Sequence, residues 1–554
     1  MRPEGRGDLD SLYFDYPQFE APDRGGELVQ ETPVVIVGAG PVGLVAALTL
    51  ARFGARSILL EKKSTFNDGS RAICVSRSSF HIFDRLGAVE PFLEKALGWT
   101  KGRSFYRGRQ FLEFDMPHDA NEKFLPMYNI QQQYIEQFLY EAARDTGLID
   151  IRWRSEVKNI HEKAGRVELD VTDPAGAYRL KADWALAADG ARSTVRAMRG
   201  LRLKGENFEG RYVIVDVKMA HDYPTIRRAL FDSKSNPGYT VLVHRQPENI
   251  WRIDYQLKPG ESAEEATREE KVRAMIAGIL SDIGHEGDWA LEWWSVYTAN
   301  TLLLDDYRDR RIFFIGDAAH IVPIFGVRGL NNGVADGENI GWKLAKVVKG
   351  EAGEALLSSY TPERRGATLD VFANAGKSTR FMTPPSRGWA LMRDAALSLS
   401  LSAPFAGGFA NPRQMTPFTY AGSPITIGAD EDFESGARPG DVAPNVRLDD
   451  GSNLVDHFSR SFTALWFGAG AGAEAPIAQL KKLDPDMRAL NVAGAIIGAE
   501  TINDDAGAIA ERYGAKAGDV FLIRPDLYFA GRWRGENASK ITDALKTILS
   551  AGEG

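Results

Sequence analysis

The chain is poor in cysteine and lacks long hydrophobic runs. A single cysteine, Cys74, occurs among its 554 residues, which excludes an intramolecular disulfide, a cysteine-rich zinc site and a Cys-x-x-Cys redox centre. No apolar stretch approaches the roughly 20 residues that cross a bilayer, and the polar start of the chain has no signal-peptide pattern. These absences predict a cytoplasmic protein in a reducing compartment, without a membrane partner.

An excess of positive charge is absent as well. Lys and Arg number 67 against 75 Asp and Glu, a formal net charge of -8, so the composition gives no electrostatic reason to bind nucleic acid. The shares of hydrophobic residues, 44%, and of charged residues, 26%, are typical of globular proteins. The length predicts several domains, and we expect small molecules as partners.

What is present begins with a βαβ pattern. Val34–Val37 is a short β-branched run, Leu44–Phe53 is apolar at helical spacing and is followed by Gly54, and Ser57–Glu61 predicts a second strand. Such a unit implies a parallel sheet at the start of an α/β fold.

Between residues 205 and 303 the pattern changes and predicts an inserted antiparallel layer. Its expected strands are Tyr212–Met219, Tyr239–His244 and Trp251–Leu257. The charged helix near Glu264–Ile279 is expected to expose its charges to solvent rather than to bind a partner.

A glycine-rich turn joins the first predicted strand to the first predicted helix. It reads GAGPVG over residues 38–43. Gly38 allows the tight turn, Gly40 lets a pyrophosphate approach the backbone, Gly43 permits close packing, and the helix N-terminus favours the anionic group. Glu61, at the end of the next strand, can accept hydrogen bonds from a ribose. The pattern predicts dinucleotide binding, but FAD and NAD share the adenosine and pyrophosphate that it recognises.

Two further segments bear on this choice. They read ALAADGARSTVR over residues 185–196 and RIFFIGDAAH over residues 311–320. With the glycine-rich turn, these motifs resemble, in the same order, those of the group A flavoprotein monooxygenases, the family of para-hydroxybenzoate hydroxylase, phenol hydroxylase and the aromatic polyketide hydroxylases. The resemblance spans about residues 33–373. It implies FAD as the cofactor and a Rossmann-type FAD-binding domain with an inserted sheet that covers the flavin ring.

The resemblance also assigns roles to single residues. Asp317 is expected to hold the ribityl hydroxyls of FAD, and the helix after Gly329 to direct its positive end at the flavin pyrimidine. Arg71 matches an arginine near the pyrophosphate, Gln132 an FAD-contacting glutamine, and Asp189 an aspartate linked to NAD(P)H use. The expected cofactor-binding residues are Gly38, Gly40, Gly43, Glu61, Arg71, Gln132, Asp189, Asp317, Gly329, Leu330 and Asn331.

The family pattern breaks after the Gly-Asp motif. Members often carry Pro-Pro-x-Gly-Gly-Gln-Gly, whereas residues 323–329 here read PIFGVRG. Arg328 replaces a small polar residue or a glutamine. This departure allows the electrostatics beside the flavin, or the preferred substrate, to differ from those of the best-known members.

The chemistry that the resemblance implies is hydride transfer from NAD(P)H to FAD, addition of O2 at the flavin C4a, and attack of the terminal oxygen of this C4a-hydroperoxyflavin on an electron-rich ring. NAD(P)H would bind transiently, without a domain of its own. The protein would exclude water, orient the ring and favour the phenolate. Strand alternation turns about half of the candidate pocket side chains away. The candidates are Tyr239, His244, Arg252, Tyr255, Trp293, Pro323 and Phe325.

Two reactive residue types near these motifs have simpler interpretations. His320 lies close to Asp317 in the sequence, and we expect it to form a structural hydrogen bond rather than to act in acid–base catalysis. Cys74 follows Arg71 closely, and we expect a buried, inert thiol.

The last part of the chain follows a polar stretch, residues 428–440, that predicts a linker. Residues 438–444, an apolar strand at Phe462–Phe467 and the segment VFLIRPD over residues 520–526 resemble the thioredoxin-like domain of phenol-hydroxylase-type members. This part has no cysteine, so disulfide chemistry is excluded and a structural or subunit-contacting role remains. The expected division is an N-terminal arm over 1–31, an FAD-binding domain over 32–204 and 304–395, a substrate-binding sheet over 205–303, a linker region over 396–436 and the thioredoxin-like domain over 437–554.

The function expected is NAD(P)H- and FAD-dependent hydroxylation of a phenolic or other electron-rich aromatic substrate with O2. A homodimer is suggested by the resemblance alone, and no metal is expected. Two alternatives stay open. One is another flavin enzyme on the same scaffold, such as a ring-cleaving or Baeyer–Villiger oxygenase or a dehydrogenase, and the other is a flavin-binding protein that acts through assembly.

Overall fold

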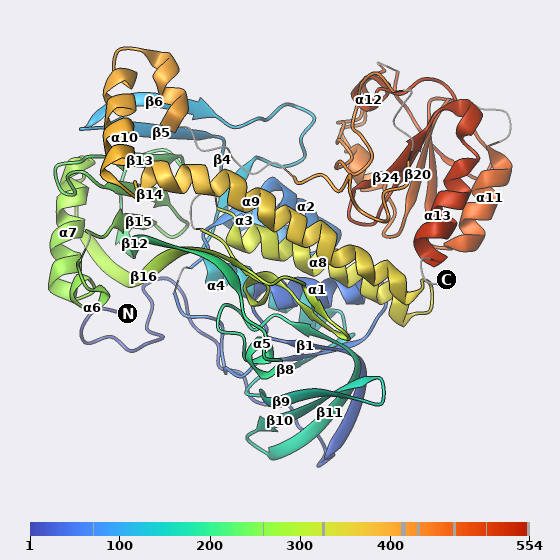
Figure 1. Cartoon of the computed structure of the whole chain (residues 1–554), viewed down its shortest axis with the longest axis horizontal. Coiled ribbons are helices and arrows are strands. Elements are labelled where there is room, and N and C mark those ends of the chain that lie inside the picture. Colours follow the sequence, from blue (N-terminus) through green and yellow to red (C-terminus); the bar gives the residue numbers. More distant parts are fainter. Residues whose placement is uncertain are drawn as a thin grey trace.

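The residues that the structure describes form three large sheets and one small sheet, with helices packed on them (Figure 1). The computed structural model describes residues 1–69, 71–258, 260–323, 327–410, 417–428, 433–468, 473–505 and 507–550. The α/β class predicted from the sequence is confirmed. None of the helices in the described ranges is long and apolar enough to span a membrane.

The first large sheet contains the predicted βαβ unit. Its order is β17–β18–β11–β1–β2–β8, and β10 and β9 extend it from β11. Strand β1 pairs in parallel with both β2 and β11, and it starts earlier than predicted because the residues before Pro33 also pair with β11. The strands are β1 (Val29–Val37), β2 (Ser57–Leu60), β8 (Ile149–Arg152), β9 (Glu156–Lys163), β10 (Arg166–Asp173), β11 (Gly176–Ala187), β17 (Arg308–Asp309) and β18 (Ile312–Phe314).

Helices α1 (Pro41–Arg52) and α8 (Gly329–Val348) pack closely beside this sheet (Figure 1). A Cβ on Gly337 would lie 2.9 Å from Val42 O, so only glycine allows this approach of the two helices. The remaining helices of this region are α2 (Arg77–Arg85), α3 (Glu90–Lys95), α4 (Gln132–Asp145), α5 (Thr194–Met198), α9 (Tyr360–Met382) and α10 (Arg387–Ser400). The small sheet consists of β3 (Cys74–Ser76), β7 (Met127–Asn129) and β4 (Leu97–Trp99).

The second large sheet differs from the predicted antiparallel insertion. Its order is β19–β16–β12–β15–β14–β13–β5–β6, and β13 pairs with β5 in parallel, so the sheet is mixed. Strands β5 and β6 come from the segment predicted to belong only to the FAD-binding domain, because pairing between distant strands leaves no local sequence signal. The strands are β5 (Lys101–Tyr106), β6 (Arg109–Asp115), β12 (Lys204–Met219), β13 (Arg227–Phe231), β14 (Thr240–Arg245), β15 (Ile250–Gln256), β16 (Trp289–Leu303) and β19 (His320–Ile321).

The predicted charged helix is divided in two. Helices α6 (Ala263–Ala266) and α7 (Glu269–Asp282) are separated where Arg268 adopts an extended backbone, with φ -61° and ψ 135°. Buried residues of α7, among them Val272 and Ile276, pack on one face of the second sheet. The other face is therefore left for contact with the FAD-binding region.

The C-terminal part forms a five-stranded sheet of its own, at the end of the molecule far from the N-terminus (Figure 1). Its central strand β20 pairs in parallel with β21 and antiparallel with β23. The thioredoxin-like resemblance stays a prediction. The elements are β20 (Thr463–Phe467), α11 (Glu474–Leu483), β21 (Arg488–Val492), β22 (Glu500–Ile502), α12 (Ala508–Tyr513), β23 (Val520–Ile523), β24 (Phe529–Trp533) and α13 (Lys540–Ser550).

Some of the described residues of the predicted linker region are packed against the protein. Helix α10 crosses its predicted start, and Tyr420, Ser423 and Ile425 are buried. The Ile427 N–H donates to Ala530 O at 2.6 Å. The buried apolar and aromatic side chains of this segment, Tyr420 and Ile425, make it a contact with the rest of the protein rather than a free linker.

The N-terminal arm is fixed on its own chain. The guanidinium of Arg2 pairs with Asp68 at 2.7 Å and also with Glu292. Arg6 pairs with the same Glu292 at 2.8 Å. The arm thus joins the second sheet to the loop that precedes Arg71.

Candidate functional site

The glycine-rich turn between β1 and α1 forms a cradle with one open position. Gly38 has a φ of +108°, and a Cβ on Gly43 would lie 2.0 Å from Gly38 O, so both positions require glycine. Gly40 has an ordinary φ of -72°, and no atom lies within 4 Å of the place its Cβ would take. The first N–H groups of α1 have no intrahelical partner. The space at Gly40 therefore fits an anionic pyrophosphate.

Two carboxylates flank this cradle. Glu61 accepts the Ala39 N–H at 2.9 Å and the Lys63 N–H at 3.0 Å, and a carboxylate has room for further donors such as ribose hydroxyls. Asp189 accepts the Val195 N–H at 3.0 Å through Oδ2. Its Oδ1 is buried and has no hydrogen-bond partner among the described residues. An unsatisfied buried oxygen beside the cradle fits a site that a cofactor completes.

Gln132 and Glu136 on α4 hold the loop that carries Arg71. Gln132 Oε1 accepts the Ala72 N–H at 3.1 Å, and its Nε2 donates to Glu136 at 2.7 Å. Glu136 also accepts the Asn67 N–H at 2.7 Å, and burial raises its pKa. Gln132 is thus a support of the loop, while the Arg71 side chain is exposed. Contacts of either residue with FAD stay predictions.

The Gly-Asp motif lies directly after β18, in a short 3-10 turn over Gly316–Ala318. The Gly316 N–H donates to Asp336 on α8 at 2.9 Å. The Asp317 side chain is exposed, and its contact with FAD stays a prediction. His320 is fully buried and contacts the same Asp336 carboxylate at 2.6 Å. The structural hydrogen bond expected of His320 is present.

Helix α8 begins beside this turn, as the resemblance implied. Its first backbone hydrogen bond runs from Asn332 N to Arg328 O at 2.9 Å. The N–H groups of Gly329, Leu330 and Asn331 precede this bond, so they carry the positive end of the helix. These N–H groups are the hydrogen-bond donors with which this helix could bind an electron-rich ring edge.

The Asn331 side chain itself is fully used within the protein. Its Nδ2 donates to Cys74 O at 3.1 Å and to Val327 O at 2.7 Å. Its Oδ1 accepts from Ser76 N and from Ser79 Oγ, both at 2.8 Å. Through these bonds the Asn331 side chain ties the start of α8 to β3 and α2, and the cofactor contact of Asn331 stays a prediction. Only its backbone remains for a ligand.

Residues 31–375 match the family model described as the FAD binding domain. The chain belongs to this family. The flavoprotein is 26% identical over 549 residues to a 3-(3-hydroxy-phenyl)propionate/3-hydroxycinnamic acid hydroxylase of Mycolicibacterium smegmatis, with 94% of each chain covered. A relative of the same name from Klebsiella pneumoniae is 30% identical over 379 residues, which are 67% of this chain and 66% of the relative.

Solved structures agree with the family. A complex of aklavinone-11 hydroxylase with FAD and aklavinone has a TM-score of 0.76 at 23% identity, over 94% of this chain and 99% of that chain. The p-nitrophenol 4-monooxygenase of Pseudomonas putida has a TM-score of 0.58 at 25% identity, over 70% of this chain and 100% of that chain. The predicted membership in the FAD-dependent aromatic hydroxylases, and FAD as the cofactor, are confirmed. Bound in this site, FAD supplies the redox chemistry and the activation of O2.

Strand alternation sorts the predicted pocket residues of the flavoprotein. His244 and Arg252 lie on the face of the second sheet away from α7, whereas Tyr255 packs with Val213 and Ile276 in the core on α7. The prediction that Tyr255 lines the pocket is therefore wrong.

The other predicted pocket residues divide as follows. Tyr239 precedes β14, and its carbonyl accepts the Asp232 N–H at 3.1 Å in the turn after β13, so its prediction as a strand residue is wrong. Trp293 lies against the FAD-binding region, since a Cβ on Gly69 would lie 2.1 Å from its ring. Pro323 is buried, and Phe325 is outside the described residues.

Four buried polar side chains cross the second sheet side by side on the face away from α7. Asp216 pairs with Arg252 and Arg252 with His244 in register, and the pairing of β13 with β14 puts Arg227 beside His244. We call Asp216, Arg252, His244 and Arg227 the polar row. Their exposed fractions are 0%, 3%, 5% and 6%. Asp216 and Arg227 are not among the predicted pocket residues, although a charged residue within an apolar strand is a signal for them in the sequence.

The charges of the polar row are unevenly matched. Arg252 donates to Asp254 at 2.6 Å, and it reaches Arg71 O at 3.4 Å in the FAD-binding loop. Burial, together with Arg227 and Arg252, lowers the pKa of His244 to about 3, so its ring is neutral at pH 7. Burial raises the pKa of Asp216 to about 8, and neither of its oxygens has a hydrogen-bond partner among the described residues.

Replacement of Asp216 by asparagine should change how stability depends on pH. The folded pKa of about 8 exceeds the unfolded value of about 3.9, so the folded chain holds a proton that the unfolded chain has released. The stability contributed by this carboxyl is therefore full below about pH 4 and is lost as the pH rises to about 8. Melting temperatures of both proteins across this range should show the advantage of Asp216→Asn growing with pH. A constant difference would contradict this assignment.

Cys74 should be unreactive in the folded flavoprotein. The side chain is 2% exposed, and its Sγ contacts Asn129 Oδ1 at 3.1 Å. Burial raises the pKa of the thiol to about 12, so almost no thiolate is present at pH 8. Titration with a thiol reagent should give no rapid reaction in buffer and one thiol per chain in denaturant. Rapid labelling of the folded protein would show that Cys74 opens to solvent.

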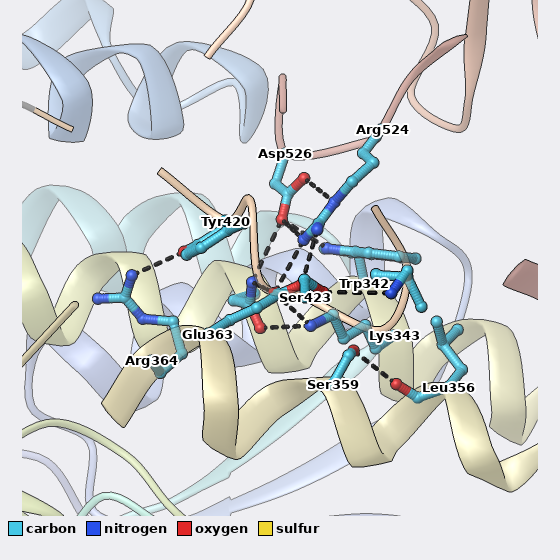
Figure 2. A network of polar contacts seen from close by, with 12 residues as sticks. Trp342, Lys343, Leu356, Ser359, Glu363, Arg364, Tyr420, Ser423, Arg524 and Asp526 are labelled. Atoms are coloured by element: carbon cyan, nitrogen blue, oxygen red, sulfur yellow. Dashed lines mark hydrogen bonds and ion pairs between the residues drawn. The ribbon is translucent and has the colours of Figure 1, made fainter. Parts of the chain in front are cut away.

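A buried polar network docks the C-terminal sheet on helices α8 and α9 (Figure 2). Glu363 on α9 accepts from Arg524 at 2.7 and 2.9 Å and from Lys343 of α8 at 2.6 Å. Ser423, from the predicted linker region, donates to Glu363 at 2.5 Å. Asp526 accepts from Arg524 at 2.7 Å. The C-terminal part is thereby joined to helix α8, which begins beside the Gly-Asp motif.

Proposed function

We propose that the flavoprotein hydroxylates a phenolic ring, with NAD(P)H as the electron donor and O2 as the oxygen source. The observation that carries this proposal is the polar row. Its side chains are buried on the sheet face toward the loop of the FAD-binding domain that carries Arg71. Arg252 connects the sheet to this loop, because its guanidinium donates to Arg71 O at 3.4 Å. A purely structural sheet face would be expected to be apolar at this depth.

The residues of the row suit a phenolic substrate. The cationic side chains of Arg227 and Arg252 favour the phenolate over the neutral phenol, because a nearby positive charge lowers the pKa of an acid. His244 is neutral and can accept a hydrogen bond from a ring hydroxyl. Burial of the row excludes the water that would compete for these groups.

The relatives support the same class of substrate. Their names give 3-(3-hydroxyphenyl)propionate and 3-hydroxycinnamic acid, which are phenols with a carboxylate side chain. We propose that the substrate of this chain shares their aromatic ring and its hydroxyl group. Transient binding of NAD(P)H, a cytoplasmic location and a homodimer are parts of the same proposal.

Oxidation of NADH and NADPH by the FAD-loaded protein tests this function directly. A panel of phenols and phenolic acids, starting with 3-(3-hydroxyphenyl)propionate, should contain members that stimulate oxidation and yield a hydroxylated ring. Ring-opened or ester products would indicate the other oxygenases on this scaffold, and a substrate oxidised without oxygen transfer would indicate a dehydrogenase. Bound FAD without stimulation by any member would favour a protein that acts through assembly.

A further inference from the structure

Arg2 is a buried cation that holds two carboxylates at once. Its side chain is 3% exposed, and its guanidinium pairs with Asp68 at 2.7 Å through Nη2 and with Glu292 through Nη1. A guanidinium presents its N–H donors in a rigid, planar fork, so one side chain can bind two separate acceptors in a fixed geometry. A single residue of the N-terminal arm therefore connects two other parts of the protein.

The two carboxylates belong to different structural units. Glu292 lies on β16 of the second sheet, next to Trp293. Asp68 lies in the connection between β2 and β3, which we call the β2–β3 loop (residues 61–73). The two units also touch each other, since a Cβ on Gly69 would lie 2.1 Å from the Trp293 ring. Arg2 thus fastens the β2–β3 loop to the substrate sheet at the point where they meet.

The β2–β3 loop runs between the two halves of the FAD site. It begins at Glu61, whose carboxylate accepts the Ala39 N–H of the glycine-rich turn at 2.9 Å. It ends at β3, where Cys74 O accepts from the Asn331 side chain at the start of α8, at 3.1 Å. The loop therefore borders the space between the two groups that we expect FAD to contact.

Separate contacts hold the two sides of the bend in this loop. The Asn67 and Ala72 N–H groups donate to side chains of α4, at 2.7 and 3.1 Å. Between them, Asp68 carries the ion pair with Arg2, which is the ion pair of this carboxylate within the described ranges. The Tyr16 hydroxyl, also from the arm, lies 3.3 Å from the same oxygen. The arm is therefore the source of the charged anchor inside the bend.

The attachment of the arm to the sheet does not depend on Arg2. Glu292 also accepts from Arg6 at 2.8 Å, from Ser11 Oγ at 2.7 Å and from the Leu12 N–H at 2.9 Å. Arg6 forms no ion pair with Asp68 among the described residues. Arg6 is therefore a matched control, since it binds the same carboxylate of the sheet but does not reach the β2–β3 loop.

We propose that Arg2 is a positioning residue of the cofactor site, which holds the β2–β3 loop in the conformation that binds FAD. A loop that is fixed before the cofactor arrives loses less conformational freedom on binding, and this raises affinity. Without the guanidinium, the Asp68 side chain, which is 32% exposed, can turn to water and release the bend. The inference concerns cofactor binding, so it stands or falls independently of the substrate and the reaction proposed above.

Equilibrium dialysis of FAD against the wild type and three variants tests this role. Arg2→Gln should raise the Kd for FAD by about fivefold, as expected for loss of one ion pair with a partly exposed partner. Asp68→Asn should raise it by a similar factor, whereas Arg6→Gln should change it by less than about twofold. Equal Kd values for Arg2→Gln and Arg6→Gln would overturn the proposal. If Arg2→Gln does not fold, an unchanged Kd in Asp68→Asn would overturn it instead.

A double-mutant cycle separates positioning from a general loss of stability. Because Arg2→Gln and Asp68→Asn remove the same contact, the double variant should bind FAD about as weakly as either single variant. Additive losses would mean that Arg2 acts through another contact, and would overturn the proposal. Melting temperatures of the FAD-free variants complete the test. If FAD affinity falls in parallel with melting temperature in both Arg2→Gln and Arg6→Gln, the arm is merely structural and the proposal is wrong.

Discussion

Gly40→Ala should lose FAD while the chain keeps its fold. The backbone at Gly40 has a φ of -72°, which alanine adopts freely, and its Cβ would meet no protein atom within 4 Å. The added methyl group therefore meets only the ligand. We expect FAD affinity to fall by at least about tenfold, equivalent to ~1.4 kcal/mol, with the melting temperature of the FAD-free protein unchanged. Equilibrium dialysis and thermal unfolding measure the two quantities.

Two other glycines serve as controls for this result. Gly43→Ala places its Cβ 2.0 Å from Gly38 O, so it should destabilise the FAD-free chain as well. Gly422→Ala adds a methyl group in open space on an exposed residue outside the cradle, so it should change neither quantity. Unchanged FAD affinity in Gly40→Ala would mean that the cofactor does not approach the backbone at this turn.

Glu363→Ala should destabilise the protein more than removal of any exposed carboxylate. Glu363 is fully buried and accepts from Arg524 and Lys343, as Figure 2 shows. Loss of Glu363 leaves Lys343 as an uncompensated buried charge and leaves Arg524 with Asp526 alone, at a cost of about 3–5 kcal/mol. Urea denaturation, followed by tryptophan fluorescence, should show this loss, with the C-terminal sheet becoming sensitive to protease at lower urea.

Glu354→Ala is the control for this variant. Its carboxylate pairs with Arg311 at 3.1 Å but is 55% exposed, and such surface pairs contribute under about 1 kcal/mol. Equal losses in Glu354→Ala and Glu363→Ala would refute the structural role assigned to the network.

The cofactor site was predictable because its constraints are local. Each constraint requires one residue type at a fixed position: glycine for the tight turn at Gly38, glycine for the close packing at Gly43, and a carboxylate at Glu61. The βαβ unit could therefore be located from the sequence. The same local pattern does not show the partners of the Asn331 side chain. The motif marks the start of α8, but it does not show that Cys74 and Ser76, far away in sequence, use the amide.

The substrate side was less predictable because it depends on strand register. Arg227 and Asp216 lie on one face of the sheet beside His244 and Arg252 only because β13, β14, β15 and β12 pair in one particular alignment, and β5 joins them from a distant segment. The alternation of side chains along a strand predicts that about half of the candidates face away from the pocket, but it does not show which ones. Tyr255, which packs in the core on α7, is an example. The docking of the C-terminal part was missed for a similar reason, since Ser423 and Arg524 meet Glu363 only in three dimensions.

The measurement that tests the account most directly is the mass of the aromatic product formed under 18O2. The FAD-loaded protein, supplied with NAD(P)H and a phenolic carboxylate, should yield a ring that carries one added oxygen atom, and that atom should be 18O. A product without 18O, or with its ring opened, would contradict aromatic hydroxylation as the function of this site.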